Sequence, residues 1–243
     1  MPGTIKLKAS LYSSCSFTEL CLSCFFHSMQ KDLGSYRKSY GKSGLKEAEL
    51  SANPMEVFQK WFYELEAMEG LDEPNAMTLA TSGLDGFPKS RVVLLKKFTY
   101  EGFVFFTNYE SEKGKAIAAN PRVCLSFFWP NMERQVIIKG KAEKIAENLS
   151  DGYFESRPEG SKLGAIVSNQ SSVIASREAL EQRLQALEKA YKNKEIPRPE
   201  YWGGYLVRPV SIEFWQGRPN RLHDRIRYSL QEDFNWKMER LAP

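Results

Sequence analysis

The spacing of apolar residues changes along the chain from a helical period to a strand period. Apolar residues recur at intervals of three and four from Phe58 to Met68, directly after Asn53-Pro54, and this period predicts a helix that ends at Gly70. Shorter segments rich in β-branched and aromatic residues follow, and such segments are typical of strands. The expected strands span residues 76–82, 89–97, 103–107, 122–129, 135–142, 204–207, 212–216 and 222–228.

Short helices are expected between these strands, at residues 111–119, 146–156, 161–167 and 176–193. Ser111 is the predicted N-cap of the first helix, and Pro158 interrupts the helical run between the second and the third. The turn Gly83-Leu84-Asp85-Gly86 predicts a hairpin between the first two strands. Roughly eight short strands with turns of the antiparallel kind indicate a barrel decorated with helices, not an alternating βαβ sheet.

Composition and charge narrow the class of protein. The 243 residues are 42% hydrophobic and 13% aromatic, which is enough for one domain with a real core. The net charge of +4 is low for a protein that binds nucleic acid, although a few well-placed cations suffice for a small anionic ligand. No stretch approaches the roughly 20 apolar residues of a membrane span. We therefore expect neither nucleic acid nor a membrane as a partner.

Three of the four cysteines, Cys15, Cys21 and Cys24, lie close to the N-terminus. They form no disulfide framework for a chain of this length, so we expect a reducing compartment and a cytoplasmic protein. A zinc site is the alternative, but the three thiols lack a convincing fourth ligand, although His27 is close. We expect no metal, and we interpret residues 1–28 as a disordered leader that lacks the features of a signal peptide.

The familiar catalytic motifs are absent from the sequence. No G-x-G-x-x-G follows a predicted strand, and neither a P-loop nor an H-E-x-x-H is present. With only two histidines, a Ser-His-Asp triad or a histidine-based metal site has little support. The chain offers instead arginine and lysine beside aromatic and polar residues, in five short segments.

The first two segments lie beside predicted strands. Arg91 and Lys96 bracket an apolar strand core, but an offset of five puts their side chains on opposite faces of a regular strand. Phe106-Thr107 ends the next strand and leads to a helix start that carries Lys113, where a helix N-terminus and a lysine can bind a phosphate. Charged strand ends and a simple capped helix are the ordinary interpretations of these two patterns.

The third and fourth segments are helical and loop-like. Tyr153, Arg157 and Ser161 are spaced four and four, and the proline between the last two bends the path, so this turn can clamp a phosphate dianion. Gln170 and Ser171 can donate hydrogen bonds to carbonyl or phosphate oxygens. Surface residues around a kink and an ordinary loop are the alternatives.

The fifth segment reads WQGRPNRLHDRI. Arg221, His223 and Arg225 are separated by one residue each, so on a β-strand they would line up on one face, where like charges repel. Trp215, at the start of the segment, is a candidate core residue. An anionic, aromatic ligand in front of the row would relieve the repulsion.

Taken jointly, these segments resemble the pyridoxamine/pyridoxine 5′-phosphate oxidase family from about Leu33 to Pro243. The resemblance is strongest in NAMTLATSGLDGFPKSRVVLLK, FFTNYESEKGK, YFESRPEGSKLGAIVSNQSSVI, YWGGYLVRP, FWQGRPNRLHDRI and the terminal ERLAP. It implies a mainly β fold with helices, an FMN-binding split β-barrel that is Greek-key-like with about six to eight strands and homodimeric, with FMN at the subunit interface. Residues 53–243 would be its catalytic domain, and residues 29–52 a flexible segment that can cover the active site.

The resemblance also implies an activity, the FMN-dependent oxidation of pyridoxine 5′-phosphate and pyridoxamine 5′-phosphate to pyridoxal 5′-phosphate in vitamin B6 salvage. The electron acceptor would be O2, which would be reduced to hydrogen peroxide. The amine substrate would also release ammonia. A hydride would pass from C4′ of the substrate to the flavin, because the cofactor carries the redox step in such enzymes.

The resemblance assigns roles residue by residue. The implied FMN-binding residues are Arg91, Val92, Val93, Leu94, Leu95, Lys96, Phe106, Thr107, Lys113, Gln135, Gln170, Ser171, Trp215 and Arg225. The implied substrate-binding residues are Arg37, Lys38, Ser39, Tyr40, Lys96, Tyr153, Arg157, Ser161, Arg221, Leu222 and His223. Arg221 and His223 are the implied catalytic residues, which orient the substrate over the flavin. Whether His223 also accepts a proton stays open.

One position departs from the family pattern, which usually has Arg-Lys where this chain has Glu112-Lys113. A carboxylate here would repel the FMN phosphate by an amount that solvent damps, unless it points away.

Two other classes of protein stay open as alternatives. A flavin reductase of the same barrel would lack the substrate residues around Arg157 and Arg221, and a non-catalytic pyridoxal-phosphate carrier would need no flavin residues such as Arg91. Both sets are present here, which favours the oxidase.

Overall fold

The computed structural model describes residues 31–68 and 72–243, and the chain divides into two compact units, Met1–Ser39 and Tyr40–Pro243. In the described part of the first unit, the chain makes a small turn in which the Gly34 N–H donates to Asp32 Oδ1 at 2.7 Å. The expected leader, residues 1–28, lies outside the described residues. The second unit carries all the regular elements discussed below.

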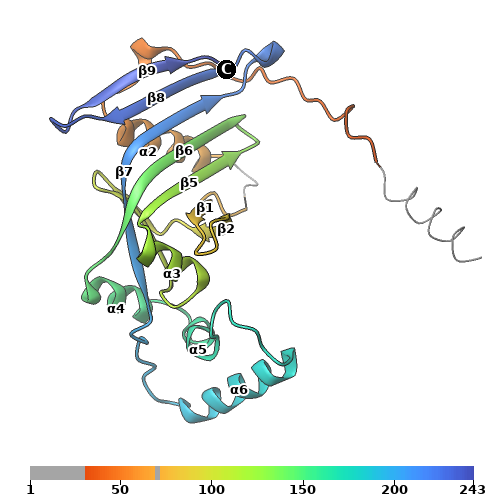
Figure 1. Ribbon diagram of the computed structural model, residues 1–243, viewed down its shortest axis with the longest axis vertical. Coiled ribbons are helices and arrows are strands. Elements are labelled where there is room, and N and C mark those ends of the chain that lie inside the picture. Colours follow the sequence, from red (N-terminus) through yellow and green to blue (C-terminus); the bar gives the residue numbers. More distant parts are fainter. Residues whose placement is uncertain (1–30, 69–71) are drawn as a thin grey trace, which may run out of the picture. The chain divides into compact units, whose positions relative to one another are not determined.

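The second unit is built mainly from antiparallel strands, with helices inserted between them (Figure 1). The strands within the described ranges are β1 (Ala76–Ser82), β2 (Pro88–Leu94), β3 (Lys97–Thr99), β4 (Gly102–Asn108), β5 (Arg122–Trp129), β6 (Arg134–Lys144), β7 (Trp202–Gln216), β8 (Asp224–Leu230) and β9 (Trp236–Leu241). The α-helices are α2 (Pro54–Glu66), α3 (Glu112–Ala119), α4 (Glu147–Glu155), α5 (Glu159–Val167) and α6 (Arg177–Ala190), and the short 3-10 helices are η1 (Glu47–Glu49) and η2 (Pro219–Arg221).

The strands form one sheet in the order β2-β1-β5-β6-β7-β4-β3, with β8 and β9 attached beside β7. The 15-residue strand β7 organises this sheet, because β6 pairs along it from Tyr205 to Gln216 on one edge. On its other edge β4 pairs with the first half and β8 with the second half. The helices α4, α5 and α6 lie where β7 begins, and β8 and β9 lie where it finishes (Figure 1).

The sheet curls back on itself into a split barrel. Its two end strands, β2 and β3, are consecutive in the chain and are separated only by Leu95 and Lys96. Within this link the Leu95 N–H donates to the Asn75 carbonyl and the Lys96 N–H donates to the Val104 carbonyl, both at 2.8 Å. The link therefore joins the β1 edge to β4 and closes the barrel.

Helix α2 packs against the barrel and supplies much of the core. Asn53 caps it by accepting a hydrogen bond from the Met55 N–H at 3.0 Å, with Pro54 in the first turn. Phe58 is fully buried, and its ring lies 5.2 Å from the Phe98 ring and 4.9 Å from the Phe103 ring. Burying one such side chain contributes about 1.5–3 kcal/mol to stability. The helix predicted to begin at Asn53-Pro54 is confirmed, but it ends at Glu66, earlier than the predicted end at Gly70, which lies outside the described residues.

A second, smaller core holds the helices at the start of β7 together. It consists of Phe154, Leu163, Ile196 and Trp202, with Phe106 and Tyr153 packed against it. This core connects α4 and α5 to the end of β4 and the beginning of β7, so it fixes the turn between the two helices against the barrel.

The sequence-based expectations for the strands are wrong in four respects. The strands expected at 204–207 and 212–216 are one strand, β7, which accommodates Pro209 because β4 stops at Val207 and β8 begins only at Ser211, so no neighbour needs the missing N–H on that edge. The strand expected at 89–97 is interrupted at the barrel-closing link. The strand expected from residue 222 begins at Asp224, and β9 lies outside the expected strands.

No helix in the described ranges is both long and apolar enough to cross a membrane.

Candidate functional site

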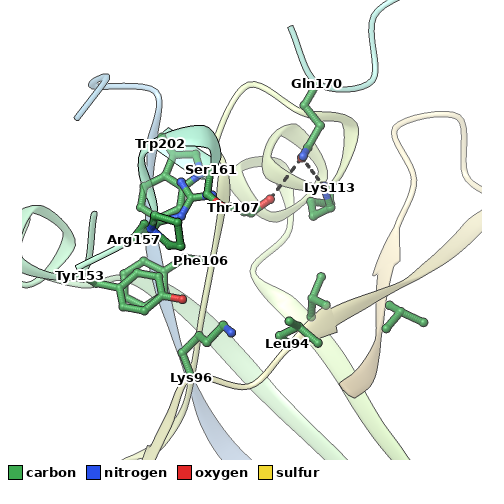
Figure 2. A pocket seen from close by; sticks show the side chains of 13 residues that line it. Leu94, Lys96, Phe106, Thr107, Lys113, Tyr153, Arg157, Ser161, Gln170 and Trp202 are labelled. Atoms are coloured by element: carbon green, nitrogen blue, oxygen red, sulfur yellow. Dashed lines mark hydrogen bonds between the residues drawn. The ribbon is translucent and has the colours of Figure 1, made fainter. Parts of the chain in front are cut away.

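A cavity of about 490 Å³ opens where β2, β4, α3, α4, α5 and β7 meet (Figure 2). It is lined by Val92, Val93, Leu94, Lys96, Phe106, Thr107, Lys113, Tyr153, Arg157, Pro158, Ser161, Gln170 and Trp202. Eleven of these thirteen residues are among the predicted FMN or substrate residues, the exceptions being Pro158 and Trp202. The link between β2 and β3 is what lets Leu94 and Lys96 border the same space. We call this space the phosphate cavity for the reasons that follow.

Lys113 forms a buried cationic corner of the phosphate cavity. It lies in the first turn of α3, which Ser111 caps by accepting a hydrogen bond from the Gly114 N–H. The Lys113 ammonium donates to Gln170 Oε1 at 2.5 Å and to Ser111 Oγ at 3.3 Å, and Thr107 Oγ1 donates to the same Gln170 oxygen at 3.3 Å (Figure 2). Burial, and then the nearby Arg91, lower the pKa of Lys113 to about 8. An anion between these donors would restore the charged form.

Arg157 forms the second cationic corner, at the turn between α4 and α5. Its guanidinium lies over the Trp202 ring, with Cζ 4.5 Å from the ring centroid. Its Nη1 is buried and has no hydrogen-bond partner among the described residues, and burial lowers the pKa of Arg157. Leaving such a group unpaired costs about 1–3 kcal/mol. Arg157 is therefore held ready for an anion that the cavity admits.

Tyr153 and Ser161 flank Arg157 across the same turn. The Tyr153 ring stacks on the Phe106 ring with 3.9 Å between centroids, which fixes its hydroxyl end beside the cavity. Ser161 lies in the first turn of α5, where its backbone N–H donates to the Pro158 carbonyl at 2.9 Å. The structure thus brings together the three residues that the spacing of four and four predicted.

Glu112 points toward two cations. Its carboxylate lies 2.5 Å from Lys89 Nζ and 3.6 Å from Arg91 Nη1, and the Lys89 hydrogen bond lowers the pKa of Glu112. Arg91 keeps a buried Nε without a hydrogen-bond partner in the described part of the chain. The departure at residue 112 therefore occupies one side of Arg91 and leaves its Nε available.

A second group of predicted residues lies at the far end of β7, and we call it the C-terminal cluster. The His223 ring lies 4.7 Å from the Trp215 ring and 5.9 Å from the Tyr40 ring. The Arg218 N–H donates to His223 Nδ1 at 3.1 Å, so a neutral His223 carries its proton on Nε2 and presents a donor there.

Gln135 also belongs to the C-terminal cluster. It pairs with Trp215 across β6 and β7, and its side-chain amide donates to Ser126 Oγ at 3.2 Å. Arg225 lies opposite Trp215 on the other edge of β7. Five predicted residues thus surround the end of this strand: Tyr40, Gln135, Trp215, His223 and Arg225.

The predicted row of three cations on one strand face is wrong. Arg221 lies in η2 with a φ of 61°, and β8 begins only at Asp224, so the three side chains do not alternate along one strand. Arg225 is neutralised by Glu213, whose Oε1 lies 2.8 Å from its Nε. The repulsion in WQGRPNRLHDRI is relieved by a turn and a carboxylate, and Arg221 remains exposed.

The remaining predicted residues lie elsewhere. Leu95 is buried in the main core, and Ser171, with a φ of 74°, lines a neighbouring hollow with Glu112. Leu222 is exposed in the loop beside His223. Arg37, Lys38 and Ser39 belong to the first unit.

Sequence reasoning missed Trp202, which stacks on Arg157 and lines the phosphate cavity. A usable signal lay in the Gly203-Gly204 pair that follows it, because paired glycines in a strand mark a close approach. A Cβ at Gly204 would come within 2.4 Å of Ile145 and 2.9 Å of Phe106. Pro158 was noticed only as a helix breaker and also lines the cavity.

The phosphate cavity and the C-terminal cluster are far apart within one chain. Trp202 and Trp215 lie at opposite ends of β7, and at about 3.3 Å per residue they are separated by roughly 40 Å along the strand. A ligand of the size of FMN cannot bridge that length. If both groups serve one ligand, they must come from two subunits.

Comparisons with known proteins agree with this geometry. Residues 64–190 match the family model described as pyridoxamine 5′-phosphate oxidase, and residues 202–243 match the pyridoxine 5′-phosphate oxidase C-terminal dimerisation region. A pyridoxine/pyridoxamine 5′-phosphate oxidase from Flavobacterium psychrophilum is 68% identical over 213 residues, which cover 88% of this chain and 100% of the relative. A protein of the same name from a Nostoc species is 54% identical over 215 residues, covering 88% of this chain and 100% of the relative.

Solved structures show the same fold. PhzG from Burkholderia lata, in complex with tetrahydrophenazine-1-carboxylic acid, superposes with a TM-score of 0.78 at 27% identity, covering 85% of this chain and 100% of the other. An FMN-binding protein from Nostoc punctiforme, related to pyridoxamine 5′-phosphate oxidase, superposes with a TM-score of 0.61 at 15% identity, covering 83% of this chain and 100% of the other.

Proposed function

This chain belongs to the pyridoxamine 5′-phosphate oxidase family, and we propose that its active site is composite, with the phosphate cavity of one subunit facing the C-terminal cluster of another. The protein is an FMN-dependent, homodimeric oxidase. It converts pyridoxine 5′-phosphate and pyridoxamine 5′-phosphate to pyridoxal 5′-phosphate with O2, releasing hydrogen peroxide and, from the amine, ammonia. One observation carries the placement of the site: Arg91 and Arg157 each bury a donor nitrogen that has no partner in the described chain.

The residues on one side of the cavity fit FMN. Lys113, Thr107 and Gln170 form a connected set of polar side chains at the N-terminus of α3. Arg91 lies outside the cavity lining, directly before the lining residue Val92, and offers its unpaired Nε. Donors of this kind at a helix N-terminus suit the phosphate of the cofactor. Val92, Val93 and Leu94, which line the cavity, would border the flavin ring. When bound, FMN supplies the redox chemistry of the reaction.

The residues on the other side fit the phosphate of the substrate. Arg157 offers a buried, unpaired Nη1 held against Trp202, and Tyr153, Ser161 and Lys96 line the same cavity. Binding a phosphate that is remote from the reacting carbon supplies energy that fixes that carbon in place. The two anion positions are separate, which matches a substrate and a cofactor that each carry one phosphate.

The C-terminal cluster of the second subunit would cover the substrate ring. Trp215, Gln135 and Arg225 would complete the flavin site, and Arg221, Leu222 and His223 would orient the substrate. Because Nδ1 of His223 is engaged by the Arg218 N–H, His223 would act as a hydrogen-bond donor through Nε2 and not as a proton acceptor. Arg221 is held in a left-handed turn conformation before β8, and it is exposed.

The domain limits and the cellular location are part of the same proposal. Residues 53–243 would be the catalytic domain, and residues 29–52 a segment that covers the site. The chain lacks a framework of disulfide-spaced cysteines, which favours the cytoplasm.

An anaerobic absorbance experiment tests the function. Pyridoxine 5′-phosphate is added to the FMN-loaded protein without oxygen, and air is then admitted. Bleaching of the flavin band that recovers in air is the expected result. A bound flavin that stays oxidised would contradict the substrate assignment and favour another activity of the same barrel.

A further inference from the structure

The segment Tyr40–Leu45, which we call the strap, lies directly on the C-terminal cluster. The Tyr40 ring meets the Trp215 ring edge-on, with 5.7 Å between centroids, and lies 5.9 Å from the His223 ring. A Cβ at Gly217 would come within 2.7 Å of Tyr40 Cγ. Tyr40 is therefore packed against the end of β7 so closely that only glycine fits at residue 217.

One buried carboxylate fastens the strap beside Tyr40. Glu133 Oε2 accepts the Gly41 N–H at 2.8 Å and the Lys42 N–H at 3.0 Å. Glu133 is only 3% exposed and adopts a φ of 56°, a conformation that non-glycine residues seldom hold unless the surroundings impose it. A carboxylate that accepts two backbone N–H groups makes charge-assisted hydrogen bonds, which are stronger than neutral ones.

The same residue is tied to the end of β7. The Glu133 carbonyl accepts the Gly217 N–H at 2.7 Å and the Gln216 side-chain amide at 3.2 Å. Glu133 also lies two residues before Gln135, which pairs with Trp215. Glu133 lies in the turn between β5 and β6. Its side chain binds the strap to this turn, and its backbone carbonyl binds the end of β7 to the same turn.

A second anchor fastens the far end of the strap. Asp224 Oδ2 accepts the Leu45 N–H at 3.0 Å, Arg240 Nη2 donates to the Leu45 carbonyl at 2.8 Å, and Arg218 Nη1 donates to the Ser43 carbonyl at 3.0 Å. Arg218 is also the residue whose N–H engages His223. The far anchor leaves the strap attached if the Glu133 bonds are lost, so Tyr40 can move while Leu45 stays in place.

We propose that Glu133 is a positioning residue of the active site, which latches the strap so that Tyr40 forms a wall of the substrate pocket beside His223 and Trp215. This inference rests on the proposed function, because it takes the C-terminal cluster to be where the substrate ring lies. Glu133 itself touches neither substrate nor cofactor in this scheme. Its effect passes through Gly41 and Lys42 to Tyr40.

The test compares Glu133→Ala and Glu133→Gln with the wild type and with a control, Glu143→Gln, whose carboxylate pairs with Arg208 away from the strap. Each FMN-loaded variant is treated briefly with trypsin, and cleavage after Lys42 is followed by mass spectrometry. Steady-state constants for pyridoxine 5′-phosphate are measured on the same samples. The FMN affinity of each variant shows whether the fold and the flavin site are intact.

For Glu133→Ala we expect cleavage after Lys42 to be at least about tenfold faster and KM to rise several-fold, with FMN affinity unchanged. Glu133→Gln, which keeps the acceptor but loses the charge, should fall between Glu133→Ala and the wild type, and Glu143→Gln should match the wild type. Saturating substrate should slow the cleavage in every variant that binds it.

Unchanged cleavage after Lys42 in both Glu133 variants, or faster cleavage with unchanged KM, would overturn the latch. If Glu133→Ala fails to fold, Glu133→Gln alone decides between these outcomes. A wild type that binds FMN but never oxidises pyridoxine 5′-phosphate would defeat the proposed function, while the proteolysis result would still report on the strap.

Discussion

Arg157 and Trp202 are stacked, with the guanidinium carbon 4.5 Å from the centre of the indole, and one donor nitrogen of the arginine is buried with no partner in the described chain. The indole holds the guanidinium flat and in place without using any of its N–H groups. An arginine arranged in this way is preorganised for an oxyanion. The relationship also explains why a tryptophan outside the predicted site residues lines the cavity.

Replacing Arg157 by alanine should weaken substrate binding more than it slows the chemical step. Losing a charge-assisted hydrogen bond costs about 1.5–3 kcal/mol, which corresponds to roughly a 10- to 150-fold rise in KM for pyridoxine 5′-phosphate. Steady-state kinetics measure the effect. Lys162→Ala, which removes a nearby cation outside the cavity lining, is the matched control. A KM within twofold of the wild type would show that Arg157 does not hold the phosphate.

Replacing Arg221 by alanine should lower kcat/KM more severely than Arg157→Ala does, because Arg221 is assigned to orient the reacting ring and not the remote phosphate. The same steady-state assay compares the two variants. Equal and small effects would remove the distinction between the two residues.

FMN affinity should fall as the pH rises above about 8. The pKa of free Lys113 is lowered to about 8, so the ammonium is charged below that pH and neutral above it. The FMN phosphate stabilises the charged form and raises the pKa of Lys113 in the complex, while the phosphate itself stays doubly charged above about pH 6. The FMN affinity is therefore highest below pH 8. It falls by up to about tenfold per pH unit between the pKa of Lys113 in the free protein and its higher pKa in the complex.

Fluorescence titrations of FMN between pH 7 and 9.5 measure this dependence. Lys113→Met should bind FMN more weakly at pH 7 and show a flat profile over the same range. A wild-type affinity that is constant to pH 9.5 would mean that Lys113 is not a phosphate ligand.

Replacing Glu112 by glutamine should strengthen FMN binding by about two- to fivefold at low salt, an effect that salt should diminish. The carboxylate competes for Arg91, whose Nη1 lies 3.6 Å away, and the neutral amide would release it. The affinity is measured by quenching of flavin fluorescence. Glu110→Gln removes a neighbouring charge that forms no ion pair with Arg91 in the described structure and serves as the control. Weaker binding in Glu112→Gln would show instead that Glu112 holds Arg91 in its working position.

Two impaired variants should restore activity when they are combined, if the assay uses pyridoxine 5′-phosphate below the wild-type KM, where each variant alone is slow. In a mixed dimer of Arg157→Ala and Arg221→Ala subunits, one of the two composite sites receives an intact Arg157 and an intact Arg221 from different chains. Random pairing gives half mixed dimers with one intact site each, so about a quarter of the wild-type activity should return. Co-expression with two affinity tags isolates the mixed dimer, in which one of the two sites is intact, so about half of the wild-type activity should return there. Activity no higher than that of the single variants would place both residues in a site within one chain.

The local signals in the sequence predicted most of the fold. Three local features are confirmed: the helical period of α2, the Ser111 cap and the hairpin at Gly83-Gly86. Each of them depends only on residues that are neighbours in the chain. The continuity of β7 through Pro209 was not predictable, because it depends on where two other strands end. The position of Arg221 was missed for a similar reason, since a period of two is equally compatible with a strand and with a turn that leads into one.

The candidate site was predictable as a set of residues but not as two separate places. The resemblance assigns Arg157 and Trp215 to one site, and nothing in the linear order says that a single strand holds their surroundings at opposite ends. Trp202 was missed because a tryptophan at a strand start is usually a core residue. The roles assigned to the individual residues remain predictions that the variants above can test.

The two-residue link between β2 and β3 has a consequence for how this protein can change. Leu95 and Lys96 close the barrel through their backbone N–H groups, and the same residues turn the chain so that Leu94 and Lys96 border one cavity. An insertion or deletion there would open the wall of the barrel and displace ligand groups in the same event. At the link between β2 and β3, this enzyme can therefore diversify only by substitution. Insertions and deletions are tolerated only in loops that do not form part of this link.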